Sequence, residues 1–271
     1  MRVIFLLKYT IYDIIIGEVN MEITIDGIKL NYIDEGMGEE VVILLHGWGA
    51  NIATMVPISN LLKEKYRVVS LDLPGFGESE EPKEVFNSYN YVEIVLKFLD
   101  ELNVKRAIFI GHSFGGKLST IISAKHKDRV IKTVIIDASG LIPKRGIDYY
   151  FKVYTFKFLR KLYTLLPLGN KEERLKSFYK KFGSDDYQTS QGIMRKILVT
   201  VVNENIKPLM KNIECETLLI WGDQDDATPL YMGEIFNKEI KNSGLVVLKG
   251  AGHYSYIDDY GTFSAVLNSY M

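Results

Sequence analysis

Short apolar runs recur along the chain, and segments with helical spacing separate them. The runs lie at residues 41–45, 68–71, 107–110, 134–136, 217–221 and 245–248. Strands that are buried on both faces of a parallel sheet have this pattern. Residues 91–102, 115–125 and 231–241 carry the intervening helical patterns. This alternation predicts an α/β fold with a mostly parallel sheet flanked by helices on both faces.

The start of the chain has a different pattern. Ile23 and Ile25, then Leu30 and Tyr32, alternate with polar residues around Asp26-Gly27. This alternation predicts a β-hairpin. The preceding residues 1–20 have too short an apolar run and no small-residue cleavage site for a signal peptide. We interpret these residues as a leader of uncertain role. They would be either an added strand or helix at the edge of the fold, or an extension that results from a start codon upstream of Met21.

Residues 141–212 interrupt the strand–helix rhythm. This long, aromatic segment has apolar residues at three- and four-residue steps. We interpret it as a helical cap, or lid, inserted between two strands of the sheet. The expected core is then formed by residues 21–140 and 213–271.

Composition narrows the possible classes of function. The 271 residues include 33 Lys plus Arg and 34 Asp plus Glu, a formal net charge of −1, which gives no reason to expect nucleic-acid binding. Cys215 is the only cysteine, so an intramolecular disulfide and a cysteine-based zinc site are excluded, and we expect a cytoplasmic protein. No apolar run approaches the roughly 18 residues of a membrane span.

The near-neutral total hides two oppositely charged parts. The expected cap contains 15 Lys plus Arg against 6 Asp plus Glu, and the remainder contains 18 against 28. Attraction between cap and core, or a solvated basic face, accounts for this bias. Alternatively, the basic cap attracts an anionic substrate or an acyl carrier.

The sharpest chemical signal is Gly111-His112-Ser113-Phe114-Gly115, directly after an apolar run and before a helical segment. Gly-x-Ser-x-Gly in this context predicts a nucleophile elbow. The tight turn needs residues without side chains at Gly111 and Gly115. It projects the Ser113 hydroxyl at the start of a helix, where the Phe114 N–H points at a developing oxyanion.

A serine hydroxyl needs a general base. His253 follows the last apolar run, and loops at the carboxyl ends of strands are where such sheets bind ligands. His126 lies in a charged helix end and is expected to be exposed. His46 follows the run 41–45 in His-Gly-Trp-Gly and is expected to brace that loop. His253 is therefore the predicted base.

The base in turn needs a carboxylate to orient it. Asp223, Asp225 and Asp226 all follow the run 217–221, and Asp137 follows the run 134–136. Spacing alone does not choose among the four, and each is equally explained as a cap or turn residue.

The chain resembles the lidded α/β-hydrolases from about Met21 to its end. The resemblance rests on four motifs: His46-Gly47-Trp48-Gly49, Asp72-Leu73-Pro74-Gly75-Phe76-Gly77-Glu78-Ser79, the elbow, and Gly222-x-x-Asp225-x-x-x-Pro229. It implies that Asp225 completes the triad and that Trp48, after His-Gly, supplies the second oxyanion N–H. The His-Gly-Trp-Gly loop is similar to that of small carboxylesterases, including one that acts on a carrier protein. The serine at the elbow departs from epoxide hydrolases and haloalkane dehalogenases, which carry aspartate there.

These residues together predict a serine hydrolase that cleaves a small-molecule carboxylic ester or thioester through an acyl-serine, without cofactor or metal. A lactonase, a carbon–carbon bond hydrolase and a perhydrolase would use the same triad. A non-catalytic ligand receptor on this fold, or an interaction module that uses the basic cap, would be a different class of protein.

Overall fold

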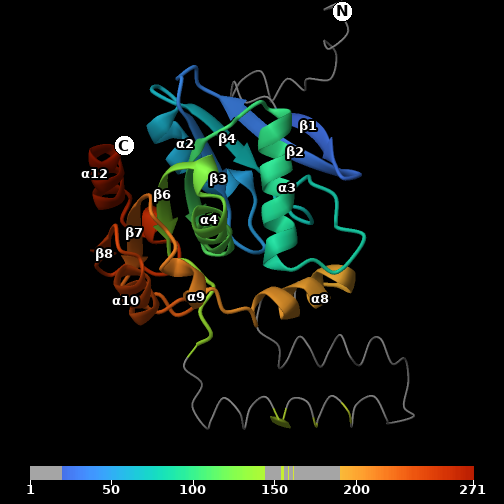
Figure 1. Ribbon diagram of the computed structural model, residues 1–271. Helices are drawn as coiled ribbons and strands as arrows, with labels where there is room; N and C mark the ends of the chain where they lie inside the picture. Colours follow the sequence, from blue (N-terminus) through green and yellow to red (C-terminus); the bar gives the residue numbers. More distant parts are fainter. Residues whose placement is uncertain (1–19, 144–153, 156–157, 159–160, 162–189) are drawn as a thin grey trace, which may run out of the picture.

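The computed structural model describes residues 20–143, 154–155, 158, 161 and 190–271. The expected leader lies outside the described residues except for its last position. Most of the expected cap, 144–189, lies outside them as well, apart from the four positions just given. Figure 1 shows the described elements around one sheet.

An eight-stranded sheet forms the centre of the protein, with strand order β1-β2-β4-β3-β5-β6-β7-β8. Strands β1 and β2 form the predicted hairpin, β2 runs antiparallel to β4, and all other neighbours are parallel. The strands are β1 (Asn20–Ile25), β2 (Ile28–Glu35), β3 (Val41–Leu45), β4 (Arg67–Leu71), β5 (Ala107–His112), β6 (Val130–Ile136), β7 (Glu216–Gly222) and β8 (Ser243–Leu248).

Helices cover both faces of the sheet in the described part of the chain. They are α2 (Val56–Leu62), α3 (Ser88–Glu101), α4 (Phe114–Lys125), α8 (Gly192–Val201), α9 (Lys207–Met210), α10 (Leu230–Glu239), α11 (Ser255–Asp258) and α12 (Tyr260–Tyr270), with short 3-10 helices η1 (Ile52–Met55) and η2 (Lys127–Arg129). The core on one face joins α3, α4 and α10 to the sheet, and the core on the other joins α2 and α12.

The apolar runs are continuous because successive residues of one strand enter opposite cores. In β3, Ile43 and Leu45 pack in the core with α3 and α4, whereas Val42 and Leu44 pack in the core with α2. Side chains of a strand alternate between the faces of its sheet, so a strand with both faces covered is apolar throughout.

Three features differ from the predictions. The run 245–248 is not buried on both faces, since Val247 is 38% exposed and β8 is an edge strand with one neighbour. His126 is half-buried at the end of α4 rather than fully exposed. Helices α2 and α12 were not predicted from the pattern.

Candidate active site

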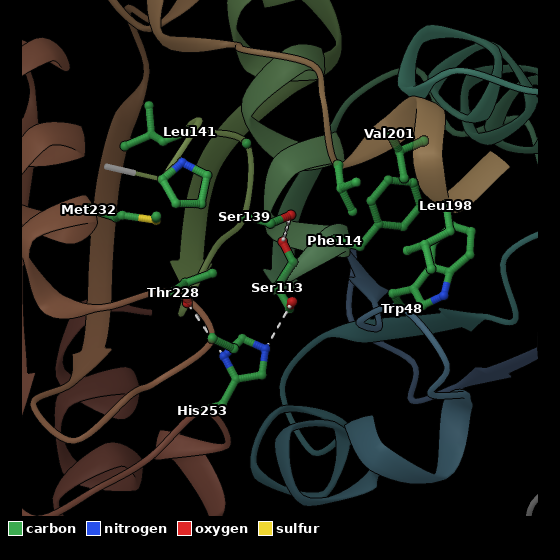
Figure 2. A pocket seen from close by; sticks show the side chains of 14 residues that line it. Trp48, Ser113, Phe114, Ser139, Leu141, Leu198, Val201, Thr228, Met232 and His253 are labelled. Carbon is green, nitrogen blue, oxygen red and sulfur yellow. Dashed lines mark hydrogen bonds between the residues drawn. The ribbon is translucent and has the colours of Figure 1, made fainter. Parts of the chain in front are cut away.

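The carboxyl ends of adjacent parallel strands bring the predicted site residues together. Strands β3, β5, β7 and β8 are followed directly by the loops that carry Trp48, Ser113, Asp225 and His253, respectively. Parallel strands present their carboxyl ends at one edge of the sheet, so residues as far apart as Trp48 and His253 in sequence meet in one place. Figure 2 shows Ser113 between the Trp48 side chain and the His253 ring.

Ser113 occupies a strained turn between β5 and α4. Its φ of 51° lies in the left-handed region, which non-glycine residues adopt at some energetic cost. The glycines on either side are required for close approach. A Cβ on Gly111 would overlap the Gly115 carbonyl, and a Cβ on Gly115 would overlap the Leu45 carbonyl of β3. The predicted elbow geometry is therefore present.

His253 lies between the serine and a carboxylate. Its Nε2 is 3.0 Å from Ser113 Oγ, and its Nδ1 is 2.9 Å from Asp225 Oδ2. A carboxylate beside Nδ1 holds the proton on that nitrogen and leaves the Nε2 lone pair to accept the serine proton. The three side chains thus have the connectivity of a nucleophile, a base and an orienting acid.

Asp225 is 4% exposed and accepts hydrogen bonds at both oxygens. Oδ1 accepts from the backbone N–H groups of Ala227 and Thr228, at 2.8 and 2.9 Å, while Oδ2 faces His253 and the Thr228 hydroxyl. Burial alone would raise the pKa of Asp225. The hydrogen bond and charge of His253, with the bonds from Thr228, outweigh it and hold the pKa below its usual value. Asp225 therefore stays ionised.

The other three candidate acids point elsewhere. Asp223 accepts from the Gly250 N–H at 2.8 Å, and Asp226 is exposed. Asp137 is fully buried and accepts from the N–H groups of Gly222 at 2.9 Å and Ser255 at 3.1 Å. Of the four carboxylates, only that of Asp225 lies within hydrogen-bond distance of the His253 ring.

Asp137 braces the loops on which the triad is built. Gly222 ends the strand before Asp225, and Ser255 lies two residues after His253, so one carboxylate connects the two loops to the end of β6. Burial raises the pKa of Asp137 to about 7 against the lowering effect of these hydrogen bonds.

The His-Gly-Trp loop lies against the elbow. The Gly115 N–H donates to the His46 carbonyl at 3.0 Å. Gly47 approaches so closely that a Cβ there would be 3.2 Å from Ser113 Cβ. Phe114 is the first residue of α4, where a backbone N–H has no partner within its own helix. Both predicted oxyanion donors, at Trp48 and Phe114, therefore belong to segments that adjoin the serine.

His46, expected to brace this loop, forms hydrogen bonds at both ring nitrogens. Its Nδ1–H donates to the Gly47 carbonyl at 2.7 Å, and its Nε2 accepts from the Leu73 N–H at 3.0 Å. It thereby connects the oxyanion loop to the turn after β4. Burial lowers the pKa of His46, so the ring is neutral in this arrangement.

Two further residues near the triad were not assigned a role from the sequence. Thr228 packs its hydroxyl 2.7 Å from Asp225 Oδ2 and 2.9 Å from the Asp137 carbonyl. His112 donates from Nε2 to the His253 carbonyl at 2.7 Å, and burial lowers its pKa to about 3. A threonine three residues after an acid is a local signal for such a contact, but the partner of His112 is 141 residues away.

A cavity of about 200 Å³ opens beside Ser113. Figure 2 shows Leu198 and Val201 near Phe114 and Trp48 on one side, with Leu141 and Met232 across from them. The polar side chains of its described lining are those of Ser113, Ser139, Thr228 and His253. Within that lining there is no Lys, Arg, Asp or Glu, so the described wall suits an uncharged group.

The described residues offer neither a metal site nor a membrane-spanning helix. They contain no group of three or more His, Cys, Asp or Glu side chains that could hold a metal ion. Nor do they include a helix that is long and apolar enough to cross a bilayer.

Comparison with known proteins gives several relatives. The chain is 27% identical over 248 residues to the uncharacterized hydrolase YugF of Bacillus subtilis (strain 168), covering 85% of this chain and 89% of the relative. It is 25% identical to Lipase 1 of Psychrobacter immobilis, covering 90% and 83%. It is 24% identical to 2-hydroxymuconate semialdehyde hydrolase of Pseudomonas sp. (strain CF600), covering 94% of each.

Solved structures give the same fold. A crystal structure of a membrane phospholipase A, a bacterial virulence factor, superimposes with a TM-score of 0.74 over 93% of this chain and 85% of that one, at 22% identity. Such low identity shows a shared fold and no more. The family model described as alpha/beta hydrolase fold matches residues 40–260, which is most of the chain. The protein therefore belongs to the α/β-hydrolase fold family.

Proposed function

We propose that the protein is a serine hydrolase that cleaves carboxylic esters through an acyl-serine intermediate. The observation that carries the proposal is the continuous chain from Ser113 Oγ to His253 Nε2, 3.0 Å, and from His253 Nδ1 to Asp225 Oδ2, 2.9 Å. A strained serine at the start of a helix, with a base already in hydrogen-bond contact, has little use outside nucleophilic catalysis.

The reaction follows from these contacts. Ser113 Oγ attacks the carbonyl carbon while His253 Nε2 removes its proton. The N–H groups of Trp48 and Phe114 stabilise the oxyanion. His253 then gives its proton to the leaving alcohol, which departs and leaves the acyl group on Ser113. A water molecule, deprotonated by His253, attacks the acyl-serine. His253 then returns that proton to Ser113 Oγ as the acyl–oxygen bond breaks and the acid is released. Asp225 keeps the imidazole oriented and stabilises its cationic form.

The cavity favours an uncharged acyl group. A carboxylate that is buried without a cationic partner would be strongly destabilised. The described lining contains no such partner, and its apolar side chains suit an alkyl or aryl acyl chain. A neutral ester is therefore our preferred substrate, and a neutral thioester fits the same description.

A second candidate is carbon–carbon bond hydrolysis. The support is the relative named 2-hydroxymuconate semialdehyde hydrolase, which matches over 94% of both chains. The same serine, base and oxyanion donors serve such a reaction, but a semialdehyde of that kind carries a carboxylate, which the described lining does not accommodate. Lactone hydrolysis and perhydrolysis remain variants of the same acyl-serine chemistry.

The expected helical cap is proposed to cover this cavity. Within the described part of the interval 141–212, α8 supplies Leu198 and Val201 to the wall, and Val202 follows directly. The excess of basic residues in 141–212 leads us to propose that the cap also attracts an anionic substrate or acyl carrier, whose charged part would stay outside the cavity. A cytoplasmic location is proposed on the cysteine content alone.

The test is a panel of p-nitrophenyl esters of increasing acyl length, measured with the wild type, Ser113→Ala and Ser264→Ala. Ser264 lies on α12, away from the described site, and is the matched control. We expect hydrolysis by the wild type and the control, and a loss of about 10⁶-fold in kcat for Ser113→Ala. A wild type that hydrolyses only a dienoic semialdehyde would favour the second candidate. A wild type that binds these esters without turnover would identify a receptor.

A further inference from the structure

A buried lysine holds the end of the helix that forms one wall of the cavity. Lys117 is 1% exposed. Its Nζ donates to the carbonyl of Val201, the last residue of α8, and to Glu204 Oε2, each at 2.6 Å. Because Val201 and Val202 line the cavity, the lysine contacts the segment that shapes it.

The same lysine belongs to the helix of the nucleophile. Lys117 lies in the first turns of α4, four residues after Ser113. Its stem passes behind the cavity wall, since a Cβ on Gly140 would be 3.2 Å from Lys117 Cγ, and Gly140 lines the cavity. The wall helix and the nucleophile are therefore joined through one side chain.

Glu204 extends this connection to a third element. Its Oε1 accepts from the N–H of Ser88 at 3.0 Å, and Ser88 is the first residue of α3. The carboxylate thus accepts from α4 through one oxygen and from α3 through the other. Figure 1 shows α8 beside the end of α3, on the side of the sheet that α3 and α4 cover.

The buried Lys117–Glu204 pair is better explained as a device that positions α8 than as a contribution to the free energy of unfolding. Burial lowers the pKa of Lys117, and the hydrogen bond and charge of Glu204 oppose that effect. Buried ion pairs are often no more stabilising than apolar residues of equal volume, and their best-attested use is to select one arrangement of the parts they join. A cation beside the last carbonyl of α8 also complements the negative end of that helix.

We propose that the Lys117–Glu204 ion pair is a positioning device that sets the distance of α8 from Ser113 and thereby the acyl length that the cavity accepts. Neither side chain lines the cavity, so the pair acts through Val201 and Val202. A single methylene in an apolar pocket changes kcat/KM by about 10-fold or more, so a small displacement of this wall changes acyl selectivity. The proposal rests on the ester hydrolysis proposed above.

The test uses Glu204→Gln and Lys117→Met in the full chain. The Lys117 and Ser88 donors reach different oxygens of the carboxylate, so in Glu204→Gln one of these donors faces the NH₂ group, which cannot accept. The matched control is Lys207→Met. It removes the more exposed ion pair between Lys207 and Glu239, whose charged atoms are 3.4 Å apart, in the same part of the chain. Two quantities are measured: kcat and KM for p-nitrophenyl acetate, butyrate and hexanoate, normalised by active-site titration, and amide hydrogen exchange in residues 192–204.

We expect the hexanoate-to-acetate ratio of kcat/KM to change by about 5-fold or more in both variants, mainly through KM, with kcat for acetate within about 3-fold of the wild type. Exchange should accelerate in 192–204 and not in β5. Lys207→Met should match the wild type in both measurements.

Equal losses for all three esters, or an unchanged ratio with unchanged exchange, would overturn the proposal and leave the pair a merely structural contact. If Lys117→Met does not fold, Glu204→Gln decides alone. A wild type that hydrolyses none of the esters would refute the proposed function instead. The exchange comparison would then still show whether the ion pair holds α8.

Discussion

Asp225→Asn should abolish most activity by reversing the proton arrangement of His253. In the wild type, Oδ1 of Asp225 accepts from two backbone N–H groups, those of Ala227 and Thr228, while Oδ2 faces His253 Nδ1. Asparagine must keep its carbonyl oxygen toward the two backbone donors, because an NH₂ group there would face two N–H groups. Its NH₂ then points at His253 Nδ1.

That orientation makes Nδ1 an acceptor and moves the imidazole proton to Nε2. His253 Nε2, 3.0 Å from Ser113 Oγ, then has no lone pair to receive the serine proton. The loss of the correct tautomer costs up to roughly 10⁴-fold in kcat, equivalent to about 5.4 kcal/mol of transition-state stabilisation. Folding should change little, since the buried backbone bonds are kept.

The assay is kcat for the best p-nitrophenyl ester, with the wild type, Asp225→Asn, Asp223→Asn and Asp226→Asn. The two neighbours control for a general change in the charge of this loop, and neither contacts the His253 ring. We expect them to stay within about 10-fold of the wild type. Activity of Asp225→Asn within that same range, or an equal loss in Asp226→Asn, would refute the tautomer argument.

Three further predictions concern stability and substrate attraction. In the folded protein the pKa of Asp137 is about 7, above its ordinary value of 3.8, so the folded state binds this proton more tightly than the unfolded state does. The resulting contribution to the free energy of unfolding is present at low pH and is lost as pH rises through 7. Urea unfolding at pH 5 and pH 8 should show a decline about 2–3 kcal/mol larger for the wild type than for Asp137→Asn, and equal declines would contradict it. Gly115→Ala should lower Tm and activity together, because its Cβ would overlap the Leu45 carbonyl; a native Tm would refute the close approach. Reversing Arg160 and Lys161 to Glu should lower kcat/KM for an anionic ester at low salt but not at high salt, and parallel behaviour of a neutral ester would remove the steering hypothesis.

The sheet and the turn at Ser113 could be predicted because their signals are local. Each apolar run indicates that its own strand is buried. The elbow motif occupies five consecutive residues, Gly111 to Gly115. The exposure of Val247 could not be predicted in the same way. It depends on β8 being an edge strand, which is a property of the strand order.

The acid could not be chosen from spacing because three aspartates follow β7 within four positions. What separates them is the direction of each side chain, and long-range contacts set it: Asp225 toward His253, Asp223 toward Gly250. The resemblance selected Asp225, and the geometry places that residue beside His253, the proposed base. The Lys117–Glu204 pair, 87 residues apart, carried no local signal at all.

The basic cap remains a prediction, since its charged residues lie mainly in 144–189, most of which is outside the described part of the chain. The described residues of the interval do show why it matters for the site. Leu198, Val201 and Val202 of this interval line the cavity, so the expected insertion forms part of its wall.

The most direct test of the central claim is to label the protein with a fluorophosphonate and locate the modified residue by peptide mass spectrometry. The account predicts one phosphonylated residue, Ser113, because it is the serine in hydrogen-bond contact with His253. Labelling should disappear in Ser113→Ala and persist in Ser264→Ala. Modification of another residue, or hydrolysis that survives in Ser113→Ala, would contradict the acyl-serine mechanism.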